Sequence, residues 1–164
     1  MKIIGIDPGL KGGLAVLDDG KIIDLIPMPI YELKNGKNNI DIKKVAEFFK
    51  KHNPDKICLE KVGAGLMGGR VSMWNFGYST GNLVGCILTL NYEFINPTPQ
   101  RWKKIVLGEK YDHKEKEGTI KFCQDTFPTV NLLATKRSKV PSDGLADAIA
   151  LAVYASIDTE NEKI

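Results

Sequence analysis

The sequence KIIGIDPGLKGGLAVLDDGKIIDLIPM, residues 2–28, decides the fold class of this chain. Residues 3–7 form a short apolar run that predicts a buried strand. Two further apolar runs, residues 12–17 and 21–28, flank the turn sequence Asp18-Asp19-Gly20. An Asp-Gly pair between apolar runs is typical of a β-hairpin. We therefore expect three consecutive strands at the start of the chain.

After the hairpin, predicted strands alternate with predicted helices. This order favours an α/β fold in which a mixed five-stranded sheet carries helices on both faces. A glycine-rich loop separates the fourth strand from a long helix, and Ser142 is the expected N-cap of the last helix. The expected strands are residues 56–62 and 93–96, the expected helices are 42–53, 72–90, 100–106, 114–126 and 142–156, and residues 31–39 are expected to be a polar loop.

Length and composition indicate an ordinary globular protein. The 164 residues fit one domain, expected over residues 1–164, and 43% of them are hydrophobic. No apolar run of about 18 residues predicts a membrane span, and we expect a soluble, cytoplasmic protein without a membrane partner. A net charge of +3 permits nucleic-acid binding but does not by itself predict it.

The cysteines and histidines do not form a metal or disulfide motif. Three cysteines are widely spaced without a C-x-x-C pair, and His52 lies far from His113 in sequence. This pattern disfavours a disulfide framework and a structural zinc site. Because Cys58 lies between Ile57 and Leu59, we expect it to be a buried thiol in a reducing compartment.

Two carboxylates stand at the ends of predicted strands. Asp7 follows the first apolar run, and Glu60 follows Ile57-Cys58-Leu59. Desolvation there would be costly without a partner, and glutamate is disfavoured in buried strands. Each residue also has an ordinary structural interpretation: Asp7 could cap the following turn, and Glu60 could pair with a basic residue such as Lys61.

The last predicted helix carries two further acids. It is apolar nearly all round, which predicts burial, yet it contains Asp143 and Asp147 four residues apart on one face. Like charges at this spacing repel, and only Asp143 is close enough to the helix start to gain from the dipole. A divalent cation would remove both the repulsion and the desolvation cost, so we favour a metal-binding role for this pair.

Together the four carboxylates predict a hard-cation site. Oxygen ligands of this kind suit Mg²⁺, or Mn²⁺, and not zinc. Two such ions about 4 Å apart can clamp the attacking and leaving oxygens of a phosphodiester. The expected chemistry is hydrolysis by a metal-activated water without a covalent protein intermediate.

Three segments in this order resemble the RuvC family of Holliday-junction resolvases. They are Ile3-Ile4-Gly5-Ile6-Asp7-Pro8-Gly9, Leu59-Glu60-Lys61-Val62, and Asp143-Gly144-Leu145-Ala146-Asp147-Ala148. The segment around Trp102-Lys103-Lys104 looks more like the resolvases of bacteriophages and prophages. The resemblance implies a ribonuclease H-like fold, a homodimer, and a catalytic, metal-binding site at Asp7, Glu60, Asp143 and Asp147. It also implies paired nicks across a four-way DNA junction; whether a branch-migration motor cooperates stays open.

The chain departs from the family pattern in two places. Many relatives space the last two acids three apart instead of four, which leaves open which acid holds which ion. Relatives also carry a phenylalanine soon after the glutamate that wedges into the junction, where this chain has Gly63. Another residue, such as Met67 or Trp74, would have to replace that wedge.

Basic residues and glycines outside these motifs suggest binding surfaces. Lysines and arginines near the site would neutralise DNA phosphates, although for any single lysine a solvated surface role is the alternative. Gly77, Gly81 and Gly85 recur every four residues along one helix, which permits close packing either on the chain's own sheet or on a second subunit. Trp74 and Tyr78 are expected to be core or interface aromatics. The residues expected to bind DNA are Arg70, Arg101, Lys103, Lys104, Lys114, Lys136, Arg137 and Lys139.

Three functions are compatible with these features. The first is a junction resolvase, and the second is another ribonuclease H-like nuclease that acts on other branched DNA or on RNA–DNA hybrids. The third is a binding protein or ATPase of the same fold. A binding protein without catalysis is disfavoured because all four acids are present, and an ATPase is disfavoured because it needs a second phosphate-binding loop and a second domain, for which we expect 164 residues to leave no room.

Overall fold

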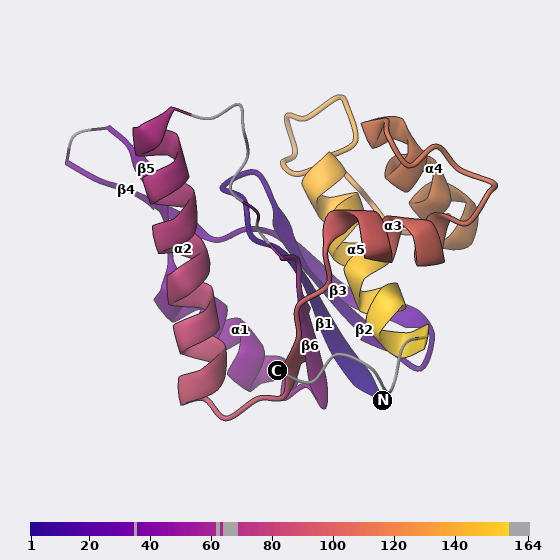
Figure 1. The fold of residues 1–164 in the computed structure, drawn as a ribbon. Coiled ribbons are helices and arrows are strands. Elements are labelled where there is room, and N and C mark those ends of the chain that lie inside the picture. Colours follow the sequence, from indigo (N-terminus) through magenta and orange to yellow (C-terminus); the bar gives the residue numbers. More distant parts are fainter. Residues whose placement is uncertain (35, 62, 64–68, 158–164) are drawn as a thin grey trace.

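A five-stranded mixed sheet forms the centre of the molecule in a computed structural model, which describes residues 1–34, 36–61, 63 and 69–157. The strand order is β3-β2-β1-β6-β7; β1 pairs antiparallel with β2 and parallel with β6, β2 pairs antiparallel with β3, and β6 pairs parallel with β7. This is the predicted α/β architecture (Figure 1). The strands are β1 (Lys2–Asp7), β2 (Gly13–Asp18), β3 (Lys21–Pro27), β6 (Lys56–Leu59) and β7 (Phe94–Ile95).

The predicted hairpin turn has the geometry that its sequence requires. Asp19 and Gly20 both have positive φ, at 45° and 76°. Two successive left-handed residues match the right-handed twist of the flanking strands, and Asp and Gly tolerate this backbone conformation better than most residues. The turn therefore fixes the β2–β3 register.

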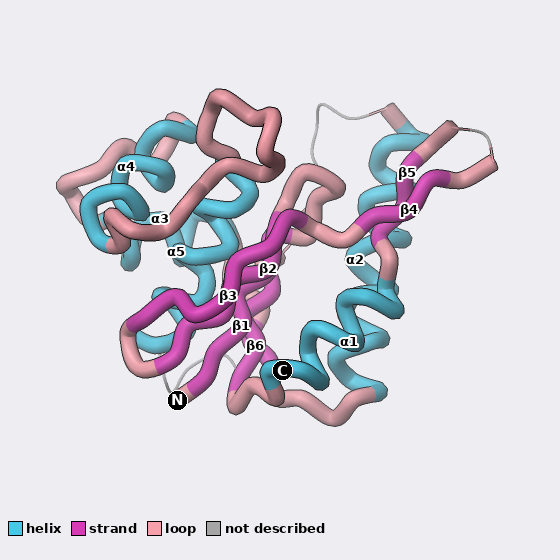
Figure 2. The backbone as a smooth tube through the Cα atoms, turned by 180° about the vertical axis from the view of Figure 1, so that it is seen from behind, coloured by secondary structure: helices cyan, strands magenta, loops and turns pink. Residues whose placement is uncertain are grey.

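Helices cover both faces of the sheet, as expected. One face packs against α1 and α2, and the other packs against α5, with α3 and α4 beside it (Figures 1 and 2). Successive residues of a strand enter different cores: Ile3 joins the α5 side, whereas Ile4 joins the α1–α2 side. The helices are α1 (Ile42–His52), α2 (Arg70–Thr89), α3 (Pro99–Leu107), α4 (Lys116–Thr126) and α5 (Asp143–Ile157).

Helix α5 lies directly on β1 because Gly5 has no side chain. A Cβ atom at Gly5 would lie 2.1 Å from the backbone oxygen of Ala148 and 2.5 Å from the backbone nitrogen of Ala152. Real Cβ atoms do not approach backbone atoms this closely, so glycine is required for this packing distance. The contact sets how near the first turns of α5 come to the end of β1.

One expectation from the sequence was wrong, and for another, one of its two alternatives is excluded. Residues 31–39 are not only a polar loop, because β4 (Ile30–Glu32) and β5 (Asn38–Ile40) form a separate two-stranded hairpin. Trp74 and Tyr78 do not belong to the core, since their exposed fractions are 72% and 53%. Both lie on α2, whose core side is formed instead by Ser79, Leu83 and Ile87.

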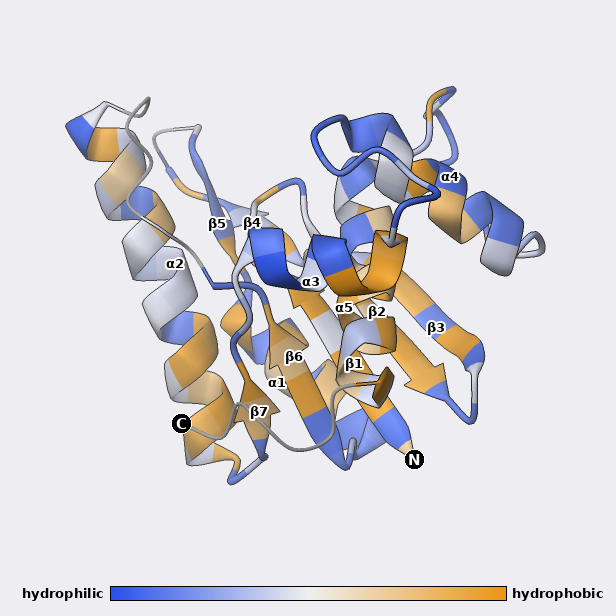
Figure 3. Cartoon of the chain, turned by 45° about the vertical axis from the view of Figure 1, so that its right-hand side comes forward, coloured by the Kyte–Doolittle hydropathy of each residue, from blue (hydrophilic) through white to orange (hydrophobic). Residues whose placement is uncertain are grey.

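Several local expectations were confirmed. The Ser142 hydroxyl accepts a hydrogen bond from the Leu145 N–H at 3.4 Å, as an N-cap does. Cys58 is buried, as expected, and so is Cys123. The strands that form the sheet interior are strongly hydrophobic (Figure 3). Across the described ranges, no helix combines the length and the apolar character needed to cross a membrane.

A candidate carboxylate active site

Asp7 and Glu60 stand side by side at the ends of two parallel strands. The β1–β6 register pairs Ile6 with Leu59, and the Glu60 N–H then donates to the Ile6 carbonyl oxygen at 3.1 Å. Side chains alternate along a strand, so Asp7 shares the face of Gly5, and Glu60 shares the face of Cys58. Both carboxylates therefore point to the side of the sheet that α5 covers.

Helix α5 brings Asp143 and Asp147 to the same place. They lie one turn apart in its first two turns, next to the Gly144 position that contacts the end of β1. A Cβ atom at Gly144 would lie 2.3 Å from the Lys11 backbone oxygen and 3.0 Å from Asp7 Oδ2. Glycine at this position therefore lets the helix start approach the Asp7 carboxylate closely.

The electrostatics show that the four predicted carboxylates share one site. Burial, followed by the nearby charges of Glu60 and Asp147 and, to a smaller extent, of Asp143, raises the pKa of Asp7 to about 7. Burial also raises the pKa values of Glu60 and Asp147, and the Asp147 charge adds to the shift at Glu60. The positive charges near Asp7, Glu60 and Asp147 therefore do not offset the burial and mutual repulsion of these carboxylates.

Asp143 differs from the other three acids. The Lys116 ammonium, at the start of α4, forms an ion pair and hydrogen bond with Asp143 Oδ2. This hydrogen bond is the main reason why the pKa of Asp143 is lowered. A lysine in the first turn of a helix is disfavoured by the helix dipole, so its interaction with the acids offsets an unfavourable position.

The turn-capping interpretation of Asp7 is also present in the structure. The Gly9 N–H donates to Asp7 Oδ1 at 3.4 Å and lowers the pKa of Asp7, but burial and the neighbouring acids outweigh it. For Glu60, the hydrogen-bond partner is an indole and not a lysine. Trp102 Nε1 donates to Glu60 Oε1 at 2.9 Å.

The donor set fits a divalent cation by its chemistry. The ligands are all carboxylate oxygens, and their mutual repulsion is what a cation would relieve. The Thr119 hydroxyl lies close enough to Asp147 to help lower its pKa, yet Oγ1 is buried and makes no hydrogen bond to any described residue. As the side chains are placed, no three His, Cys, Asp or Glu residues in the described ranges are arranged to hold one ion together. The fit therefore rests on the chemistry of the donors and not on a formed coordination shell.

The predicted DNA-binding residues lie in different surroundings. Lys103 lies over the Trp102 ring, 5.4 Å from its centroid, and its charge lowers the pKa values of Glu60 and Asp147. Arg101 uses Nε to donate to the Tyr154 hydroxyl at 2.8 Å, which links α3 to α5, so part of its guanidinium has a structural role. The remaining predicted residues, Arg70, Lys104, Lys114, Lys136, Arg137 and Lys139, are exposed.

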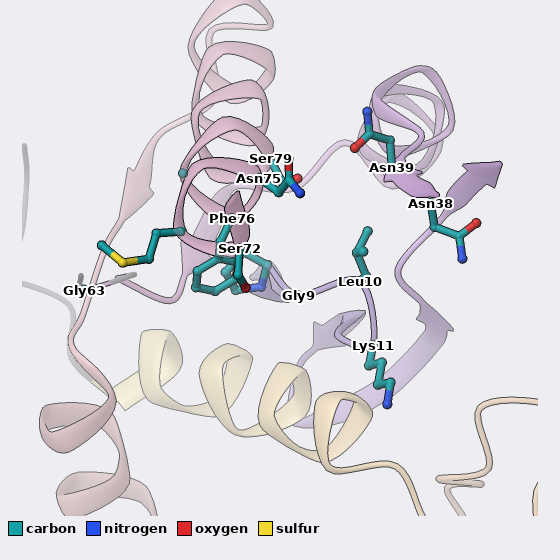
Figure 4. Close-up of a pocket in the computed structure, with 13 residues that line it drawn as sticks. Gly9, Leu10, Lys11, Asn38, Asn39, Gly63, Ser72, Asn75, Phe76 and Ser79 are labelled. Carbon is teal, nitrogen blue, oxygen red and sulfur yellow. The ribbon is translucent and has the colours of Figure 1, made fainter. Parts of the chain in front are cut away.

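A pocket of about 720 Å³ lies beside the acids, on the other side of the loop that follows Asp7. Figure 4 shows Gly9 and Leu10 on this loop facing the first half of α2, whereas the Lys11 side chain points away from that helix. Asn38, Asn39 and Phe76 also line the pocket, and none of its described lining residues is acidic. The pocket is therefore a neighbouring surface that is mostly neutral and carries one lysine, Lys11.

Reasoning from the sequence missed three residues of the site. Lys116, Trp102 and Thr119 contact or influence the acids from α3 and α4, far from the acids in sequence. Trp102 was noticed only as part of a resemblance. The alternatives for the wedge remain unassigned: Met67 lies outside the described residues, and Trp74 is exposed near the start of α2.

Comparisons with known proteins establish the fold. No protein-family model and no curated protein sequence matches the chain. Among solved structures, the chain is similar to Thermus thermophilus RuvC in complex with a Holliday-junction substrate, with a TM-score of 0.65, 15% identity and full coverage of both chains. It is also similar to Thermus thermophilus RuvC alone, with a TM-score of 0.63, 17% identity and full coverage of both chains. The Fowlpox virus resolvase in complex with Holliday-junction DNA has a TM-score of 0.52 and 17% identity, over 96% of this chain and 99% of that chain. The fold is therefore ribonuclease H-like, as predicted.

Proposed function

We propose that this protein is a metal-dependent endonuclease that resolves four-way DNA junctions by paired phosphodiester hydrolysis. The observation that carries the proposal is the meeting of four carboxylates from two strand ends and one helix, with the pKa of Asp7 raised to about 7 by burial and then by the charges of the other three. Strongly shifted pKa values of this kind cluster at functional sites. The solved structures of similar fold include two complexes with Holliday-junction DNA, which supports this substrate class.

Asp7, Glu60 and Asp147 would hold Mg²⁺ or Mn²⁺, two ions per site, together with Asp143. Bound ions would supply an activated water and neutralise the charge that develops on the phosphodiester oxygens. Lys116 keeps Asp143 ionised, because its ammonium lowers the pKa of that carboxyl. Lys103 adds positive charge on the side of Glu60 and Asp147.

The exposed side of α2 supports a homodimer. Gly77, Gly81 and Gly85 are exposed, and a Cβ at each would meet no atom within 4 Å, so packing on the chain's own sheet is not the reason for the glycines. The buried residues of α2 are Ser79, Leu83 and Ile87. Each follows one of these glycines by two positions, which is a rotation of about 200° around the helix axis. The glycines therefore face away from the core.

A heptad-like seam runs along the same exposed side. Its spacing of three and four residues averages 3.5, which is the repeat that lets two helices pack along a continuous stripe. Two glycines in the middle would allow close approach, and apolar side chains flank them. The seam consists of Val71, Trp74, Tyr78, Gly81, Gly85 and Leu88, all of them exposed. A two-fold dimer through this seam would place two active sites at a fixed separation, as paired cuts require.

The exposed basic residues would bind the phosphates of the junction arms. Lys136, Arg137 and Lys139 precede α5, whose first two turns carry two of the acids. Such contacts make affinity depend on salt concentration. Together with the Trp102 segment, these features favour a RuvC-like resolvase of the bacteriophage or prophage type.

The test is cleavage of a synthetic four-way junction by purified protein with Mg²⁺, with and without a chelator. A replication fork, a linear duplex and an RNA–DNA hybrid of matched sequence are the comparison substrates. We expect symmetric nicks in opposite strands of the junction only when metal is present. Preferential cutting of forks or hybrids would support the other ribonuclease H-like nuclease, and cleavage that survives chelation would contradict the metal site.

A further inference from the structure

Trp102 joins the site through an uncharged hydrogen bond. Its side chain is fully buried, and its indole N–H donates to Glu60 Oε1 at 2.9 Å. A buried indole N–H usually finds a partner, but many backbone carbonyls could serve. Here the partner is one of the acids that would bind metal.

Hydrogen bonds other than the one from the indole already hold the backbone around Glu60. The Glu60 N–H donates to the Ile6 oxygen, the Lys61 N–H donates to the Pro97 oxygen at 2.8 Å, and the Asn96 side-chain amide donates to the Leu59 oxygen at 2.7 Å. These bonds hold the strand end, but they leave the glutamate side chain free to rotate. The indole N–H restrains the carboxylate itself, through its hydrogen bond to Oε1.

The position of the indole is in turn well determined. Thr98 caps α3 by accepting from the Arg101 N–H at 3.3 Å, and Pro99 begins the helix. Arg101 then links α3 to the buried Tyr154 hydroxyl on α5. The start of α3 is therefore held by its cap and by the Arg101 contact with α5, and this holds the Trp102 indole N–H in place beside Glu60.

A neutral donor and a cation have different effects on a metal ligand. Lys116 compensates the charge of Asp143, whereas an indole N–H is a donor only and leaves the full negative charge on Glu60. Outer hydrogen bonds of this type orient carboxylate ligands and are worth about 10–100-fold in metal affinity. Because the indole binds Oε1, Oε2 is the carboxylate oxygen that makes no hydrogen bond to a described residue.

We propose that Trp102 is a positioning residue that orients the Glu60 carboxylate for metal binding without neutralising it. This role rests on the proposed metal-dependent function. It assigns to α3 a part in building the metal site, in addition to carrying Lys103 and Lys104 on its surface.

The first experiment measures Mn²⁺ and Mg²⁺ affinity by calorimetry for Trp102→Phe, which keeps an aromatic ring and removes the N–H. We expect about a 10-fold loss of affinity. Tyr92→Phe is the matched control, because it removes the hydrogen bond of a partly buried aromatic residue to the Phe49 oxygen on the α1–α2 side of the sheet without touching Glu60 or α3, and its affinity should stay within about twofold of wild type. Equal losses in both variants, or no loss in Trp102→Phe, would overturn the proposal.

A double-mutant cycle shows whether the effect passes through Glu60. In a Glu60→Ala background, Trp102→Phe should change metal affinity by less than about twofold, because the side chain that the indole orients is already gone. A further 10-fold loss in that background would assign the effect to general packing around the indole.

The second experiment leaves Trp102 intact and so does not depend on the folding of a core variant. The chain has two tryptophans, so Trp74→Phe makes Trp102 the sole emitter. Mn²⁺ is paramagnetic and should quench this emission saturably, with Mg²⁺ reversing the quenching by competition. Unchanged emission while calorimetry reports Mn²⁺ binding would place the ion away from Glu60. If wild-type protein binds Mn²⁺ with quenching but cuts no junction, the proposed function fails and the positioning role stands.

Discussion

Replacing Asp7 by asparagine should stabilise the metal-free protein at neutral and higher pH. The pKa of Asp7 is raised from 3.8 to about 7, chiefly by burial. Asparagine keeps the shape of the side chain and an oxygen that can accept the Gly9 N–H, but it carries no charge. The substitution therefore removes a buried charge without removing the turn contact.

The sign and size of the effect follow from proton linkage. Between pH values of about 4 and 7, the folded state holds a proton on Asp7 that the unfolded state has released, so the free energy of unfolding decreases as pH rises. A shift of about 3 units at 1.36 kcal/mol each sets an upper limit of about 4 kcal/mol. Salt and the coupled titration of Glu60 and Asp147 reduce the share that belongs to Asp7 alone.

The assay is urea unfolding in a chelator at pH values from 4 to 8. For wild type, the free energy of unfolding should fall across this range. For Asp7→Asn it should fall less, so that the variant is the more stable protein at pH 8 by at least about 1 kcal/mol. Mg²⁺ should stabilise wild type selectively and so reduce the advantage of the variant, by about 2.7 kcal/mol for an ion at 100 times its Kd.

Asp125→Asn is the matched control. It makes the same chemical change at an exposed site where hydrogen bonds from Tyr111 and Lys110 lower the pKa of the carboxyl. Because the sign is opposite there, this variant should gain no stability at pH 8. A metal-free Asp7→Asn protein that is less stable than wild type at pH 8 would refute the electrostatic reasoning and leave Asp7 as a structural turn residue.

The remaining predictions concern catalysis, metal binding, assembly and packing. Glu60→Gln and Asp147→Asn should each abolish junction cleavage in gel assays but retain junction binding, and a variant that cuts at a near wild-type rate would show that its residue is not a metal ligand. In melting experiments, Mg²⁺ or Mn²⁺ should raise the Tm of wild type, and metal-free Asp147→Asn should melt higher than metal-free wild type; a lower Tm would indicate a structural partner for that aspartate. Gly81→Leu should sediment as a folded monomer that nicks one strand without paired resolution, and a variant that stays dimeric would remove the α2 seam from the interface. Gly5→Ala should lose at least about 1–3 kcal/mol in urea unfolding, because its Cβ would lie 2.1 Å from a backbone oxygen of α5, whereas Gly9→Ala, with no described contact closer than 3.7 Å, should change little.

Local patterns in the sequence were sufficient to predict most of the elements and the four acids. The apolar run before Asp7 and the Asp-Gly turn specify β1 and the β2–β3 hairpin by side-chain periodicity and backbone conformation alone. The aspartates of α5 were noticeable because charges are rare in a helix that is apolar all round. These signals depend on neighbours in sequence, and for that reason a single sequence contains them.

Contacts between distant segments could not be predicted in this way. The Trp102–Glu60 hydrogen bond joins residues 42 positions apart, and the sequence around either residue does not indicate that the other is its partner. The β4–β5 hairpin could not be predicted because its strands have three residues each, too few to show the two-residue alternation of a strand. The orientation of α2 was ambiguous for a different reason: apolar residues lie on all its sides, so the exposure of Trp74 is decided by tertiary packing.

The contact of α5 with Gly5 makes the width of the acid cluster a property of how the helix docks. Two acids belong to the sheet and two to the helix, so, together with the close approach at Gly144, the backbone contact at Gly5 sets the gap between the pairs, and none of the acids does. Replacing Gly5 by a bulkier residue would widen the gap while all four carboxylates remained. Inactivity in such a protein would come from an altered spacing, and a search of its sequence for missing acids would find nothing wrong.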